Sequence, residues 1–254
     1  MTKNKDDLVS IIMPAYNASR YLPDAIESVL AQTHENWELL IVDDCSKDSS
    51  VEVIRRYRER DSRVKLLLNK QNLGPALSRN YAIKNANGRY IAFLDSDDIW
   101  SSDKLNIQLK VMNNYRHSFT YTSYHRISED GKAAGKKIDV PNKLNYRQLL
   151  KNTAIVTSSV VLDISRIGTI QMKRTYYDDF ACWLEVLKKG VTAYGIDKDL
   201  VCYRVTSASV SRNKLRSAMH VWNTYRTVEE LNILTSISCF LGYAYNATKK
   251  YLKD

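Results

Sequence analysis

The chain has 254 residues, enough for one α/β domain with a sizeable hydrophobic core. Hydrophobic residues make up 44% and charged residues 26%, and the 8 Gly and 4 Pro are too few to favour long disordered segments. The net charge of +10 suits phosphate-rich ligands, nucleic acid or an anionic membrane, although a generally basic surface explains any single lysine or arginine equally well.

Neither a disulfide framework nor a zinc site is predicted from the cysteines. They lie far apart, form no C-x-x-C pair and have no histidine at zinc-binding spacing. The N-terminal stretch MTKNKDDLVS lacks the apolar core of a signal peptide, and no apolar run approaches the roughly 20 residues that span a bilayer. We therefore expect a cytoplasmic protein, in which the sequons at Asn17 and Asn246 are chance matches.

In the first half of the chain, short apolar strands alternate with amphipathic helices. Strands are predicted at residues 9–13, 37–42, 64–68 and 90–94. Helices are predicted at residues 22–30, 51–57, 75–86 and 105–112. Asp48 is expected to cap the second helix, and Gly88 to end the third. This alternation predicts a mostly parallel sheet with helices on both faces.

The pattern changes near residue 118. Residues 118–128 alternate like an antiparallel strand, residues 129–132 form a turn, and the polar stretch 131–143 is expected to be a flexible loop. Later elements are predicted as a helix at 145–152, a strand at 154–162, a helix at 179–189 that ends at Gly190, and helical structure from 214 onward.

Polar side chains gather where the predicted parallel strands end, which is where ligands bind in open α/β sheets. In chain order these residues are Pro14, Tyr16 and Asn17, then Asp43 and Asp44, then Asn72 and Gly74, and finally Asp95, Ser96 and Asp97. Two acidic groups on one sheet edge repel each other, so a bound cation or hydrogen-bond donors must offset the cost.

The two acidic groups suit different ligands. Asp95 and Asp97, one residue apart, suit Mg²⁺ or Mn²⁺, which prefer carboxylate and phosphate oxygens. Asp43 and Asp44 can accept hydrogen bonds from a pyrimidine ring or from ribose hydroxyls, and Tyr16 offers an aromatic face for the base. The alternative is that Asp44 and its neighbours only cap the following helix.

Taken in order, five segments resemble glycosyltransferase family 2, the inverting enzymes of GT-A fold. They are IIMPAYN, QTHENWELLIVDDCSKDSS, NLGPALSRN, NGRYIAFLDSDD and YYDDFACWLEVLKKG. The resemblance covers residues 9–211 and implies an α/β GT-A fold with a mostly parallel nucleotide-binding sheet, helices on both faces and C-terminal helices. It implies a donor site that includes Pro14, Tyr16, Asp44, Arg79 and Asp95. It also implies that Asp97 is the main ligand of a Mn²⁺ or Mg²⁺ ion that bridges to the donor pyrophosphate.

The resemblance further implies roles for residues in the second half. Asp179 matches the family's catalytic base, with helix capping as the alternative interpretation. Arg204 lies in a segment, continuing to Ser209 and Ser211, that resembles the one folding over the donor pyrophosphate. Many relatives have a histidine where this chain has Thr206, which puts any contact made by that histidine in doubt.

The predicted function is inverting transfer of a sugar from a nucleotide-diphosphate sugar, with a UDP-sugar as first choice, to a glycan acceptor. The resemblance suggests a lipid-linked acceptor in bacterial O-antigen, capsule or lipooligosaccharide synthesis. One catalytic unit is expected over 1–254, with a nucleotide-sugar half at 1–117, an acceptor half at 118–212 and a helical segment at 213–254. No nucleic-acid partner is expected, and a homodimer is a further partner considered.

Two alternatives stay open. A sugar nucleotidyltransferase should show a Gly-rich, Arg-containing loop after the first strand, where this chain has PAYNASRY. A non-catalytic nucleotide-sugar-binding protein would be expected to lose the carboxylates of Asp95, Asp97 or Asp179, and all three are present.

The C-terminal segment predicts peripheral membrane contact. Residues 233–245 (ILTSISCFLGYAY) are largely apolar but too short to span, and they lead into Lys249, Lys250, Tyr251 and Lys253. Apolar length with basic flanks is typical of a helix that lies in the headgroup region of an anionic membrane. We therefore expect association with the inner face of the cytoplasmic membrane. The alternative is a helix that packs on the catalytic domain or on a dimer partner.

Overall fold

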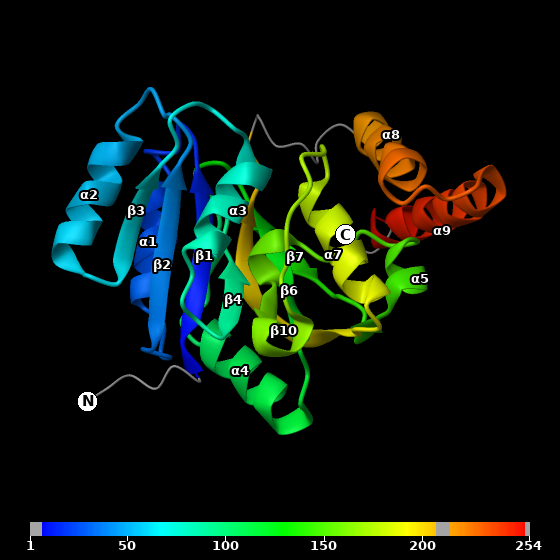
Figure 1. Cartoon of the computed structure of the whole chain (residues 1–254), viewed down its shortest axis with the longest axis horizontal. Coiled ribbons are helices and arrows are strands. Elements are labelled where there is room, and N and C mark those ends of the chain that lie inside the picture. Colours follow the sequence, from blue (N-terminus) through cyan, green and yellow to red (C-terminus); the bar gives the residue numbers. More distant parts are fainter. Residues whose placement is uncertain (1–6, 207–213, 252–254) are drawn as a thin grey trace.

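One mixed sheet runs through the computed structural model, which describes residues 7–206 and 214–251 (Figure 1). Its strands are β1 (Val9–Ala15), β2 (Trp37–Asp43), β3 (Val64–Leu68), β4 (Tyr90–Phe93), β5 (Ile99–Trp100), β6 (Phe119–Ile127), β7 (Ala134–Ile138), β8 (Lys143–Leu144), β9 (Val161–Asp163) and β10 (Ala193–Arg204). They are ordered β3-β2-β1-β4-β9-β6-β10-β5, with β7 beside β6 and β8 beside β10.

Helices lie on both faces of this sheet and at one end of the molecule (Figure 1). They are α1 (Leu22–Leu30), α2 (Ser50–Arg60), α3 (Pro75–Lys84), α4 (Lys104–Tyr115), α5 (Tyr146–Leu149), α6 (Ile164–Ile167), α7 (Asp178–Lys188), α8 (Lys214–Asn223) and α9 (Ile233–Tyr251). A 3-10 turn, η2 (Thr157–Ser159), precedes β9, and a π-type turn, η4 (Thr224–Val228), follows α8. Helices α5, α8 and α9 gather at the end of the molecule opposite α2 (Figure 1).

The first half confirms the predicted parallel sheet. β1 pairs in parallel with both β2 and β4, and β2 pairs in parallel with β3. Every residue of β2 is buried, as expected for a strand covered on both faces. The carboxyl ends of these strands therefore meet at one edge, as the sequence predicts.

The second half adds reversed strands to that sheet. β9 runs antiparallel between β4 and β6. β6 is antiparallel to β7 and β9, as predicted, but its longest pairing is parallel, with β10. The strand β10 was not predicted, because the ladder is interrupted by irregular register near Asp199 and most of its residues are only partly buried or exposed.

Three local predictions are wrong. Residues 154–162 are not one strand, since η2 interrupts them and only Val161–Asp163 pairs in the sheet. Residues 131–143 are not simply a loop, because Ala134–Ile138 pairs with β6 through backbone bonds while four of its five side chains stay exposed. Gly88 does not cap α3, which ends at Lys84. A Cβ there would lie 2.6 Å from the carbonyl oxygen of Leu8, so close backbone approach requires the glycine.

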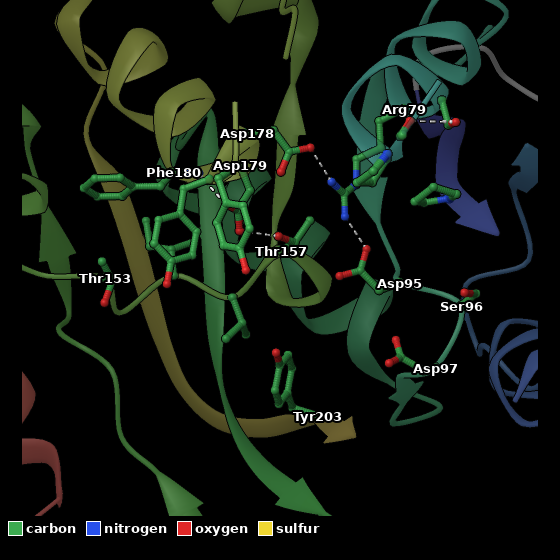
Figure 2. Close-up of a pocket in the computed structure, with 18 of the residues that line it drawn as sticks. Arg79, Asp95, Ser96, Asp97, Thr153, Thr157, Asp178, Asp179, Phe180 and Tyr203 are labelled. Carbon is green, nitrogen blue, oxygen red and sulfur yellow. Dashed lines mark hydrogen bonds and ion pairs between the residues drawn. The ribbon is translucent and has the colours of Figure 1, made fainter. Parts of the chain in front are cut away.

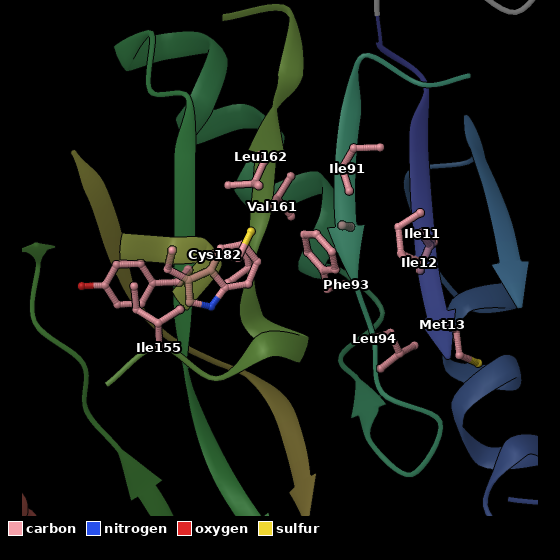
Figure 3. Close-up of a cluster of buried hydrophobic side chains, with 14 of the residues drawn as sticks. Ile11, Ile12, Met13, Ile91, Phe93, Leu94, Ile155, Val161, Leu162 and Cys182 are labelled. Atoms are coloured by element: carbon pink, nitrogen blue, oxygen red, sulfur yellow. The ribbon is translucent and has the colours of Figure 1, made fainter. Parts of the chain in front are cut away.

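The core fixes α7 against the middle of the sheet. Trp183 is almost fully buried, and its ring meets the edges of Phe93 at 5.2 Å and of Phe119 at 5.4 Å between centroids. Aliphatic side chains from β1, β4 and β9 continue the same core, with Ile12, Ile91 and Leu162 among them (Figure 3). The first turn of α7, which carries Asp178 and Asp179, is thereby held at the edge where the parallel strands end.

Candidate active site

A cavity of about 720 Å³ opens at the carboxyl edge of the parallel strands (Figure 2). One wall comes from the strand ends of the first half of the chain, and the other comes from η2, α7 and the end of β10, with contributions from α8 and α9. Of the predicted site residues, those that line it are Pro14, Tyr16, Asp44, Asn72, Gly74, Arg79, Asp95, Ser96, Asp97 and Asp179.

Asp44 is held rigidly on the first wall. Its Oδ1 accepts hydrogen bonds from the Asn69 side chain at 2.7 Å and from the Leu73 N–H at 2.8 Å. Its Oδ2 accepts from the Gly74 N–H at 2.7 Å, and Gly74 has the positive φ of 84° that favours glycine at this turn. The Asn72 side chain donates to the Asp44 carbonyl. The carboxylate is therefore oriented before any ligand arrives, and it does not cap α2.

Three other predicted residues are not among the described residues that line the cavity. Asn17 has a positive φ of 49°, and its side chain accepts from the Lys47 N–H, so it shapes the loop after β1. Asp43 is buried and accepts from the Ser46 N–H. Arg204 is also buried, with partners described below. By contrast, Tyr16 is 47% exposed at the rim, where its ring is free to stack on a flat ligand.

Arg79 joins the two walls of the cavity. It projects from α3, and its Nη2 donates to Asp95 Oδ1 at 2.5 Å while its Nη1 donates to Asp178 Oδ2 at 2.7 Å (Figure 2). Burial opposes its charged form, but the two carboxylates outweigh burial and raise the pKa of Arg79. The arginine therefore couples the position of the predicted metal-binding loop to the start of α7.

Asp95 and Asp97 form an acidic pair beside the cavity (Figure 2). Burial and the charge of Asp95 raise the pKa of Asp97 to about 6, so this carboxylate is ionised at a cost that a nearby cation would offset. No cluster of three or more histidine, cysteine or acidic side chains suited to a metal occurs among the described residues. The pair fits a hard divalent cation whose remaining ligands are phosphate and water oxygens.

Buried hydrogen bonds made by Asp98 and Arg204 hold the loop that carries Asp95 and Asp97. Asp98 accepts from the Ser158 hydroxyl at 2.5 Å and from the Arg204 N–H at 2.9 Å, and burial raises its pKa. The Arg204 side chain donates to the Asp97 carbonyl at 2.8 Å, to the Glu129 carbonyl and to Asp24. Arg204 thus fixes the loop backbone, a role that the sequence did not indicate.

Asp179 lies on the opposite wall from Asp97 (Figure 2). Its Oδ2 accepts a hydrogen bond from the Thr157 hydroxyl at 2.6 Å, and its Oδ1 accepts from the Phe180 N–H. The neighbouring Asp178 is buried and bound to Arg79. Both carboxyls therefore have partners outside α7, which the capping interpretation does not account for.

Aromatic side chains make up much of the second wall, and an aromatic wall was not predicted from the sequence. They are Tyr124, Tyr176, Tyr177, Phe180, Trp183, Tyr203 and Tyr243. The pair Tyr176-Tyr177, directly before the acidic residues of α7, is the signal that could have revealed them. Stacked rings and phenolic hydroxyls suit a sugar, which presents apolar C–H faces and polar edges.

The side chains of His125 and His220 do not line the cavity. His125 pairs with Asp199 at the surface, and His220 stacks on Tyr176 with ring centroids 3.3 Å apart, so neither matches a metal ligand. Thr206 lines the cavity. Ser209 and Ser211 lie outside the described residues.

The sequence of this chain is similar to those of known glycosyltransferases. Residues 10–162 match the family model described as "Glycosyl transferase family 2". A Bacillus subtilis protein assigned to teichuronic acid biosynthesis, the glycosyltransferase TuaG, is 43% identical over 251 residues, which cover 98% of this chain and 99% of that protein. The Escherichia coli protein named UDP-Glc:alpha-D-GlcNAc-diphosphoundecaprenol beta-1,3-glucosyltransferase WfgD is 39% identical, with coverage of 98% and 97%.

Solved structures agree in fold. The Staphylococcus aureus enzyme TarS (residues 1–349, in complex with UDP) superposes with a TM-score of 0.68 at 16% identity, covering 93% of this chain and 70% of that one. The Pyrobaculum calidifontis mannosyltransferase PcManGT, in complex with GDP-Man and Mn²⁺, gives 0.69 at 16% identity, with coverage of 94% and 69%. The fold is thus that of the GT-A glycosyltransferases. The chain belongs to glycosyltransferase family 2, as its sequence motifs predict.

Proposed function

We propose that the chain transfers a sugar, with inversion, from a UDP-sugar to a lipid-linked glycan acceptor in bacterial surface-polysaccharide synthesis. The observation that carries the proposal is that Asp97 and Asp179 lie on opposite walls of one cavity. Arg79 links the two walls, since it binds Asp95 beside Asp97 and Asp178 beside Asp179. Relatives of known name support the acceptor class, since WfgD and WfaP of Escherichia coli are named for a diphosphoundecaprenol acceptor and a UDP-Glc donor.

The first wall would hold the donor. Tyr16 offers a stacking face for the base, and Asp44 presents an oriented carboxylate to the nucleoside. Asp97, with Asp95, would hold Mn²⁺ or Mg²⁺, which supplies charge neutralisation for the leaving diphosphate. The solved structure of PcManGT, which shares this fold, contains GDP-Man and Mn²⁺, and this supports a metal at Asp95 and Asp97.

The second wall would hold the acceptor and carry out the proton transfer. The acceptor hydroxyl oxygen attacks the anomeric carbon on the face opposite the diphosphate, the bond to the diphosphate breaks, and Asp179 takes the hydroxyl proton. The Thr157 hydrogen bond holds Asp179 Oδ2, which leaves the carboxylate pointing in one direction. The tyrosines around it would contact the glycan.

We place the donor site and the acceptor site in the two predicted halves of the chain, with one addition. We assign donor binding to residues 1–117 and acceptor binding to residues 118–212. Ser217 on α8 and Tyr243 on α9 also line the cavity, so we extend the acceptor site into the helical segment 213–254.

Aspartate-to-asparagine variants test the proposal. In a panel of nucleotide sugars with Mn²⁺, wild-type protein should release the nucleoside diphosphate, with UDP-glucose as the first donor tried. Asp97→Asn should lose most turnover, and Asp179→Asn should bind the donor but lose about 10²–10⁴-fold in rate, as expected for a lost general base. Release of diphosphate should stop in excess EDTA.

The matched control is Asp197→Asn, which removes a carboxyl that is 63% exposed and pairs with Lys137 away from the cavity. It should keep full turnover. A wild-type protein that binds UDP-sugars but never cleaves them would favour the non-catalytic alternative. Full turnover of Asp179→Asn at neutral pH would move the base to another residue.

A further inference from the structure

Helix α9 presents an apolar face to solvent. Five of its large apolar side chains are exposed, with fractions of 50% for Ile233, 77% for Leu234, 45% for Ile237, 65% for Leu241 and 66% for Tyr245. From Leu234 onward they recur every three to four residues, and with Ile233 they lie on one side of the helix over about three turns. Large exposed apolar side chains usually occur singly, so a continuous stripe marks a contact surface.

The same face carries no charge. Residues 233–248 contain no Asp, Glu, Lys or Arg, and the other exposed residues of this segment are uncharged: Thr235, Ser238, Ala244 and Thr248. The opposite side of α9 is used by the fold, since Ser236 and Cys239 are buried and Tyr243 lines the cavity. The helix therefore separates the acceptor wall from an uncharged outer surface. No helix within the described residues is long and apolar enough to cross a membrane.

An exposed basic residue lies against α9 next to this stripe. Lys151, just after α5, is exposed, and α9 packs on it, because the Asn246 side chain donates to the Lys151 carbonyl at 2.9 Å. Gly242 permits the close approach, since a Cβ on it would lie 2.9 Å from the Lys151 side chain. The sequence of α9 continues into Lys249 and Lys250.

We propose that the outer face of α9 inserts into the headgroup region of an anionic lipid bilayer, with the basic side chain of Lys151 near the phosphates. The inference rests on the proposed function, because it places the Tyr243 side of the cavity at the surface where a lipid-linked acceptor resides. An uncharged apolar stripe with basic flanks is the surface that an interfacial helix needs.

A second copy of the chain fits this face less well. A two-fold contact through α9 would bring together two copies of a chain whose net charge is +10, each with the exposed Lys151 against this helix. Like charges at such an interface oppose association, whereas an anionic bilayer attracts them. Charge complementarity therefore favours an anionic bilayer over a second copy of the chain as the partner of this face.

The test compares two matched glutamate substitutions in the full chain. Leu241→Glu places a charge in the outer face of α9, and Tyr115→Glu places one on α4, where the tyrosine is 68% exposed. Wild type and Tyr115→Glu should sediment with phosphatidylglycerol-containing vesicles and less with pure phosphatidylcholine vesicles. Leu241→Glu should bind the anionic vesicles about tenfold more weakly or worse.

Release of UDP from UDP-glucose in solution and thermal melting are measured on the same proteins. Both should be equal for wild type and Leu241→Glu, since the outer face of α9 lies away from the cavity. Equal vesicle binding by wild type and Leu241→Glu, or no binding by wild type, overturns the inference. A wild-type dimer that Leu241→Glu converts to monomer in sedimentation velocity overturns it in favour of a second copy. Failure of UDP release by wild type would count against the proposed function alone, because vesicle binding is measured separately.

Discussion

At the scale of single residues, Thr157 decides how the proposed base is aimed. Its hydroxyl donates to Asp179 Oδ2 at 2.6 Å, and the side chain is buried in the short turn η2. Thr157→Val keeps the shape but removes the donor. We expect kcat to fall about tenfold with little change in the KM for the donor, because only the orientation of Asp179 changes.

Thr157→Ser supplies the control, since it restores the hydroxyl and should recover most of the lost rate. The Kd for the UDP-sugar is the second measurement, and it should stay at the wild-type value in both variants because the donor wall is unchanged. A rate for Thr157→Ser as low as that of Thr157→Val would make Thr157 a packing residue only.

Asp48 controls a different residue-scale property, the joining of the loop after β1 to the start of α2. It accepts hydrogen bonds from the N–H groups of Ser19 and of Ser50, the first residue of α2. It does not occupy the predicted N-cap position, which belongs to Ser49. Burial opposes ionisation, but these bonds outweigh it and lower the pKa of Asp48 to about 2.

The sign of the pH effect follows from that shift. A carboxyl whose folded pKa is lowered stabilises the fold above its unfolded pKa and loses this contribution as the pH falls through the folded value. Asp48→Asn should therefore reduce the free energy of unfolding by about 1 kcal/mol at pH 7. Urea titrations should show the difference from wild type shrinking below about pH 4. A difference that is constant down to pH 3 would contradict this account.

At the scale of elements, periodicity predicted the parts of the chain that are buried on both faces. β1, β2 and β4 are almost wholly buried and appear in the sequence as continuous apolar runs. Periodicity failed where side-chain burial and backbone pairing diverge. The apolar side chains of residues 154–162 line the cavity or pack in the core without forming one strand, whereas β7 pairs its backbone while four of its five side chains are exposed. The unit boundaries at 117 and 212 stay predictions.

The same limit applies within the site. The strand-end residues Asp44, Asp95 and Asp97 could be predicted because β-α alternation fixes where strands end. The role of Arg204 in holding the loop backbone could not be predicted, because its three partners, Asp24, Asp97 and Glu129, come from distant segments of the chain. The aromatic wall depends on how β6, β10, α7 and α9 pack together, which the sequence alone does not determine.

At the scale of elements, the contribution of α7 to stability can be tested at Trp183. Trp183 anchors this helix through Phe93 and Phe119, so Trp183→Ala should lower the free energy of unfolding by about 3–5 kcal/mol. Trp183→Phe keeps a ring in the pocket and should cost less. Trp222→Phe on the partly buried face of α8 is the control and should cost least. Urea unfolding of the three variants gives the order, and equal losses for Trp183→Ala and Trp222→Phe would show that α7 is not anchored there.

At the scale of the whole molecule, the cavity joins two walls that are far apart in sequence, so ligand binding should stabilise the fold as a unit. Arg79 on α3 holds Asp95 after β4 and Asp178 on α7, which links the donor wall to the acceptor wall. UDP with Mn²⁺ at about 100 times its Kd should add about 2.7 kcal/mol to the free energy of unfolding. For a chain of this size that corresponds to a rise in Tm of about 5–10 °C.

The contribution of the metal can be separated from that of the nucleotide. UDP in EDTA should give a smaller rise in Tm than UDP with Mn²⁺, because only the base and ribose contacts on the first wall remain. Asp97→Asn should have nearly the wild-type Tm without ligand but should lose the Mn²⁺-dependent part of the rise, since this carboxylate would hold the ion beside the diphosphate. Equal rises with and without Mn²⁺ in the wild type would place the diphosphate on protein groups alone, and Asp97 would then have no metal to bind.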